Sequence, residues 1–98
     1  PPMTQPSMPQ YGESDAARIK RLAMRSWRRG TKEMDLILGP FADAHLATLS
    51  EVELRAYDAL LSENDQDLYL WITGARVAPS EHAPLIARIG DFARLRMR

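Results

Sequence analysis

The stretch 28-RRGTKEMDLILGPF-41 has the pattern of a joint between two helices. Gly30 interrupts a basic helical segment, and glycine commonly ends a helix because it adopts left-handed backbone angles without a steric penalty. After Thr31, apolar residues recur at i, i+3, i+4 and i+7, a spacing that places them on one face of a second helix. These residues are Met34, Ile37, Leu38 and Phe41. The stretch therefore predicts a helical domain.

Helices are predicted on both sides of this joint. Upstream, Ser14 or Asp15 is in position to cap a first helix, which Gly30 then ends. Downstream, Ser50 and Glu53 have the spacing of a capping box, in which each side chain bonds to the backbone N–H of the other residue. This pair predicts the start of a third helix.

A fourth and a fifth helix follow. Asn64 or Asp65 is the predicted cap of the fourth helix, and Gly74 is its predicted end. Within it, Tyr69 and Trp71 lie two residues apart and point in different directions, so we expect Trp71 in the core and Tyr69 at its rim. The fifth helix carries apolar residues at helical spacing, namely Leu85, Ile86, Ile89, Phe92 and Ala93.

No segment of four or more residues alternates polar and apolar side chains as a strand would. The sequence therefore predicts an all-α fold, a compact five-helix bundle that forms a single domain over residues 14–98. Residues 1–13 are rich in Pro, Gln and Ser, lack the features of a secretory or transit peptide, and are expected to form a disordered arm. The longest apolar runs are too short to cross a bilayer, so we expect no insertion into a membrane.

The net charge is zero, but the charges are unevenly distributed along the chain. Residues 1–32 hold seven Lys or Arg against two acids, and residues 33–67 hold one against nine. One interpretation is a small helical nucleic-acid-binding protein, in which the basic segment 18–32 meets phosphates and Trp27 stacks on a base. The nine acids that follow would repel a polyanion unless they faced away, so we keep this interpretation as the alternative.

The residue types that most enzymes use for catalysis are scarce in this chain. There is no Cys, which excludes disulfides, thiolate zinc sites and cysteine nucleophiles. His45 and His82 are the only histidines, and neither has further ligands at metal-binding spacing, so both are interpreted as surface or helix-end histidines. The carboxylates between residues 51 and 67 are interpreted as helix caps and solvated faces. We therefore expect neither a catalytic site nor a metal site.

Five short motifs, in order along the chain, carry a resemblance to a known family. They are 29-RGTKE-33, Asp35, 38-LGPF-41, 49-LSEVE-53 and 67-DLYLW-71. The first is an Arg-Gly-x-x-Glu (RGxxE) motif. Together they resemble the SdhE (YgfY) family of succinate dehydrogenase assembly factors, over residues 25–71 and more loosely to about Leu95. Families of this kind often carry Met after the glycine, whereas this chain has Thr31, which can cap a helix.

The resemblance implies a chaperone of flavinylation. Such a protein helps to attach FAD covalently to the flavoprotein subunit of succinate dehydrogenase and, in some members, of the related fumarate reductase. It implies that the chain is no enzyme and holds no FAD stably, because the cofactor and the histidine bonded to it belong to the partner. The chain alone is expected to be a monomer that binds no nucleic acid. Its expected location is the cytoplasm of a bacterium or the mitochondrial matrix of a eukaryote.

The resemblance also implies a partner-binding surface around the RGxxE motif. Gly30 provides a tight corner and omits a side chain where the backbone of another protein can approach closely. Arg29 and Glu33 are expected to flank this surface. The residues assigned to partner binding are Arg25, Arg28, Arg29, Gly30, Glu33 and Asp35.

Overall fold

The computed structural model describes residues 13–96, which fold into five α-helices and no strand. The helices are α1 (Asp15–Ser26), α2 (Lys32–His45), α3 (Glu51–Leu60), α4 (Asp65–Thr73) and α5 (Ala83–Arg96), with a short 3₁₀ turn, η1 (Leu46–Thr48), after α2. The predicted all-α, five-helix fold is confirmed. Residues 1–12 of the predicted arm, and residues 97–98, lie outside the described residues. Glu13, which the sequence assigned to the arm, forms an ion pair with Arg21.

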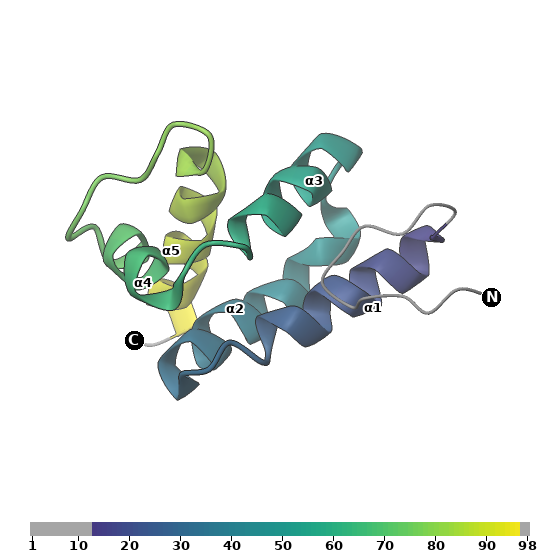
Figure 1. The fold of residues 1–98 in the computed structure, drawn as a ribbon, viewed down its shortest axis with the longest axis horizontal. Coiled ribbons are helices and arrows are strands. Elements are labelled where there is room, and N and C mark those ends of the chain that lie inside the picture. Colours follow the sequence, from purple (N-terminus) through teal and green to yellow (C-terminus); the bar gives the residue numbers. More distant parts are fainter. Residues whose placement is uncertain (1–12, 97–98) are drawn as a thin grey trace.

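The helices pack around one core. As Figure 1 shows, α1 and α2 lie side by side and run in opposite directions, α3 crosses on one side of this pair, and α4 and α5 lie together at one end. Helix α5 packs against α2, α3 and α4, so it connects α4 with α2 and α3. All four apolar residues that the sequence placed on the inner face of α2 are buried, namely Met34, Ile37, Leu38 and Phe41. No helix within residues 13–96 is long and apolar enough to span a membrane.

The helix starts form where the local sequence predicts them. Ser14, Thr31 and Asn64 each accept a hydrogen bond from the backbone N–H three residues later, which satisfies a donor that has no partner within the helix. Both bonds of the capping box at Ser50 are present. Gly74 ends α4 with a φ of 82°, a left-handed conformation that favours glycine. These interactions fix the boundaries of the elements that carry the candidate site.

Candidate protein-interaction site

Helix α1 ends at Ser26, with Trp27 as its cap, so the prediction that Gly30 ends this helix is wrong; Gly30 instead forms the corner that leads into α2. Gly30 has a φ of 108°, a backbone angle that residues with a Cβ rarely adopt. A Cβ at this position would still have room, since the nearest heavy atom, Oδ2 of Asp65, would lie 3.8 Å away. Backbone strain, rather than crowding, therefore requires glycine at this position.

The arginine of the RGxxE motif faces inward. Its Nε donates to Oδ1 of Asp65 at 2.8 Å, and its two terminal nitrogens donate to the carbonyl oxygens of Leu61 at 2.5 Å and Glu63 at 2.7 Å. Its backbone N–H donates to Oδ1 of Asp35 at 2.6 Å. Only 10% of the Arg29 side chain is exposed. Arg29 therefore ties the α1–α2 corner to the loop between α3 and α4.

The six residues assigned to partner binding divide into two groups. Arg25 pairs with Asp58 of α3 at 2.6 Å, and Arg29 and Asp35 form the bonds described above, so these side chains are engaged within the molecule. Arg28, Gly30 and Glu33 are exposed. The side chains of Arg28 and Glu33 form no hydrogen bond or ion pair with any residue from 13 to 96.

Most of the basic residues of α1 are neutralised by acids of the third helix. Arg18 pairs with Glu51, and Arg21 and Arg25 both pair with Asp58. Hydrogen bonds from Arg18 and then Arg55 lower the pKa of Glu51 to about 2. Because these arginines already face carboxylates, the basic segment does not form a continuous surface for phosphates, and the nucleic-acid interpretation is not supported.

Trp27, the residue proposed to stack on a base, packs against α2. A Cβ at Gly39 would lie 2.2 Å from Cδ2 of the indole, so only glycine at position 39 lets the ring approach this closely. The indole N–H donates to Oδ2 of Asp43 at 3.2 Å. Although 39% of Trp27 remains exposed, its position is fixed by contacts within the molecule.

Neither histidine belongs to a metal site within residues 13–96, where no group of three potential ligands lies together. Both lie at helix ends, as predicted, but His82 is buried rather than at the surface. Its Nε2 lies 2.9 Å from a carboxylate oxygen of Glu63, and its ring stacks on Trp71. His45 contacts the rings of Phe41 and Phe92. We therefore assign both histidines to packing.

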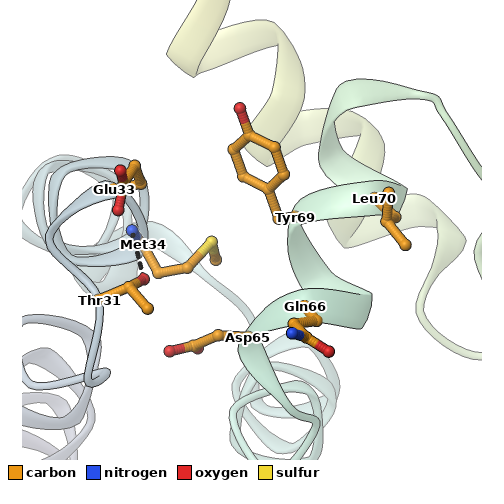
Figure 2. A pocket seen from close by; sticks show the side chains of 7 residues that line it. All are labelled: Thr31, Glu33, Met34, Asp65, Gln66, Tyr69 and Leu70. Atoms are coloured by element: carbon orange, nitrogen blue, oxygen red, sulfur yellow. Dashed lines mark hydrogen bonds between the residues drawn. The ribbon is translucent and has the colours of Figure 1, made fainter.

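A hollow of about 530 Å³ lies between the start of α2 and helix α4, beside the RGxxE corner. We call it the corner hollow, and it is lined by Thr31, Glu33, Met34, Asp65, Gln66, Tyr69 and Leu70. Figure 2 shows Glu33 and Met34 on the α2 side and Tyr69 and Leu70 on the α4 side. Glu33 and Tyr69 also line a second hollow, which continues toward Gly90 and Arg94 of α5.

The sequence predicted only part of this surface. Glu33 was assigned to it, and Tyr69 was expected at the rim of the core, where 45% of the residue is indeed exposed. Trp71, by contrast, packs against the core. Nothing local in the sequence indicated that Tyr69 and Glu33, 36 positions apart, would line one hollow. The exposed Leu36, which lines the second hollow, was also missed.

The exposed corner lies beside a largely apolar hollow, and exposed apolar surface of this kind often marks a site of protein interaction. The family model described as "Flavinator of succinate dehydrogenase" matches residues 20–93. The chain belongs to this family. The match begins within α1 and ends within α5, so it includes the RGxxE corner and both sides of the corner hollow.

Curated relatives agree with this assignment. The chain is 42% identical over 73 residues to a protein of Aspergillus terreus, covering 74% of this chain and 24% of the relative. It is 46% identical over 86 residues to a protein of Candida glabrata, covering 83% and 56%, respectively. Both are named succinate dehydrogenase assembly factor 2, mitochondrial. The chain therefore spans between about a quarter and just over half of the length of these relatives.

Proposed function

We propose that this protein promotes the covalent attachment of FAD to the flavoprotein subunit of succinate dehydrogenase by binding to that subunit. The observation that carries the proposal is the family match, which extends over residues 20–93 and so includes most of the described fold. The names of the relatives point to the same assembly process. The surface around Gly30 and Glu33 is the proposed contact, because it is exposed and lies beside the corner hollow.

The proposed mechanism is the stabilisation of one conformation of the partner. Attachment of FAD requires the acceptor histidine of the partner to lie next to the flavin, and a bound chaperone can favour the arrangement of partner domains that brings them together. This mechanism requires a complementary surface and no acid, base or nucleophile from the chaperone. Under this proposal the chain is no enzyme, and both FAD and the reacting histidine remain on the partner.

The geometry of the RGxxE corner supports a division of roles within the motif. Arg29 holds the corner against the α3–α4 loop through three side-chain hydrogen bonds. Gly30 permits the turn and leaves the outer surface without a side chain, so the partner's backbone can approach. Glu33, exposed and unpaired within residues 13–96, is the member of the motif available to the partner.

Co-expression tests the proposal. The flavoprotein subunit is produced with and without this protein, and covalent flavin is measured as fluorescence of the subunit band in a denaturing gel. We expect strong labelling only when the protein is present. Equal labelling in the two samples, with equal amounts of folded subunit, would contradict the proposed function.

A further inference from the structure

The charges and shape of the corner hollow indicate what it binds. We propose that this hollow receives an arginine side chain of the partner protein, with the guanidinium paired to Glu33 and placed against Tyr69. The identity of the partner rests on the function proposed above. The chemistry of the occupant is argued from the hollow itself.

The corner hollow carries an uncompensated negative charge. Among the described residues that line it, two are carboxylates, Glu33 and Asp65, and none is Lys or Arg. Oδ1 of Asp65 accepts a hydrogen bond from Arg29, whereas Glu33 has no partner within residues 13–96. An occupant with a positive charge would therefore gain an ion pair with Glu33 without displacing an existing one.

The remaining lining favours arginine over lysine. Tyr69, which is 45% exposed, offers an aromatic ring, and Leu70 offers partly exposed apolar surface on which an aliphatic stem can lie, whereas Met34 lines the hollow but is almost fully buried. A planar guanidinium stacks on aromatic rings and bonds to a carboxylate through two parallel N–H groups, whereas an ammonium is a strongly hydrated point charge. A hollow with one unpaired carboxylate, one exposed ring and apolar lining matches these properties of arginine.

The second hollow shares Glu33 and Tyr69 with the corner hollow but differs from it in the charge of its other residues. Arg94 lines it, and this side chain pairs with Asp91 at 2.7 Å, so the second hollow contains a cation of its own. Its other residues are mostly apolar, including Leu36, Ile37 and Ile72. A basic side chain is therefore expected to enter between α2 and α4, on the side nearer to Gly30.

Binding of the complete protein to the flavoprotein subunit provides the first test. Glu33→Gln keeps the shape of the side chain and removes its charge, so we expect the dissociation constant to rise about 10- to 100-fold. Tyr69→Leu keeps apolar area and removes the ring, so it should raise the dissociation constant about 2- to 10-fold. Glu81→Gln, which changes an exposed carboxylate that lines neither hollow, is the matched control and should bind like the unaltered protein.

Cross-linking identifies the occupant directly. A photo-cross-linking amino acid in place of Gln66, which is exposed and lines the hollow, should attach to a partner segment that contains an arginine. Exchange of that arginine for Glu should abolish binding of the unaltered protein and restore binding of Glu33→Arg. Circular dichroism of each variant establishes that the fold is retained.

The outcomes separate the two proposals. Two outcomes overturn the arginine inference but not the proposed function. One is that the protein binds and cross-links only to segments without arginine; the other is that Glu33→Gln binds as tightly as Glu81→Gln. Failure of the unaltered protein to bind the subunit at all overturns both. Restoration by the charge exchange supports the inference, because a merely structural role of Glu33 would not respond to a change in the partner.

Discussion

Two faces of this small bundle differ in whether their charged side chains form ion pairs within the molecule. On the paired face, Arg18, Arg21 and Arg25 of α1 meet Glu51 and Asp58 of α3 in a set of ion pairs. On the open face, which consists of the corner hollow and Gly30, the carboxylate of Glu33 has no partner within residues 13–96. Charges that are matched within the molecule mainly hold helices together, whereas an unmatched charge beside apolar surface is available to another protein.

The RGxxE motif contains one charged residue of each kind, a paired arginine and an unpaired glutamate, within the described residues. Arg29 and Glu33 are four residues apart, yet the side chain of Arg29 is nearly buried and that of Glu33 is exposed. A short motif can therefore combine residues that build a surface with residues that contact the partner. The predictions below test this separation by changing stability and function independently.

The largest effect on stability is expected from the core that both faces share. Leu60 is fully buried. Leu60→Ala should lower the free energy of unfolding by roughly 2–5 kcal/mol, because it removes buried methyl groups and leaves a cavity. The melting temperature, followed by circular dichroism, should fall by more than about 8 °C. Loss of flavinylation by this variant should follow its unfolded fraction, and full activity in an unfolded sample would contradict the need for the fold.

Arg29→Lys tests whether the motif arginine builds the surface. A single ammonium cannot reproduce three hydrogen bonds to Asp65 and to the carbonyls of Leu61 and Glu63, so we expect a loss of about 2–3 kcal/mol in unfolding free energy. Urea unfolding measures this loss of unfolding free energy. Arg28→Lys, at the exposed neighbouring position, is the control and should unfold like the unaltered protein. A variant at Arg29 as stable as this control would show that the inward bonds contribute little.

Two substitutions of Gly30 distinguish the effect of backbone strain on stability from an effect on partner binding. Gly30→Ala and Gly30→Arg should each cost about 1 kcal/mol of stability, since both place a Cβ on a residue whose φ is 108°. Flavinylation should fall much further for Gly30→Arg, because only arginine adds a large charged side chain to the proposed contact surface. Melting temperatures and covalent flavin yields of the two variants decide the point. Equal flavin yields would place the partner away from this corner.

The local features of the fold were predictable from the sequence, whereas the interactions that shape the site were not. Ser50 and Asn64 were identifiable as caps because their partners lie three residues away. Arg29 was assigned to partner binding from the family resemblance. Its inward bonds were not predictable, because the side-chain acceptors lie more than 30 positions downstream and two of them are backbone carbonyls, which any residue type supplies. The pairing of Arg18 with Glu51 is equally distant, so the basic helix looked like an exposed surface.

The smallest expected effect concerns acid stability of the paired face. Hydrogen bonds from Arg18 and Arg55 lower the pKa of Glu51 from 4.5 to about 2. The folded protein therefore holds this carboxylate ionised where the unfolded chain has begun to bind a proton. The resulting stabilisation is present above about pH 4.5 and is lost as the pH falls toward 2.

Glu51→Gln should flatten this part of the pH dependence. Urea unfolding of the variant and of the unaltered protein is compared at pH 7, 4 and 2.5, and the difference between them should be largest at pH 7 and shrink as the pH falls. Because the hydrogen bond from Arg18 is the largest cause of the pKa shift, Arg18→Gln should flatten the profile more than Arg55→Gln does. If neither arginine variant changes the profile, the ion pairs of Glu51 with Arg18 and Arg55 do not set the acid stability of this face.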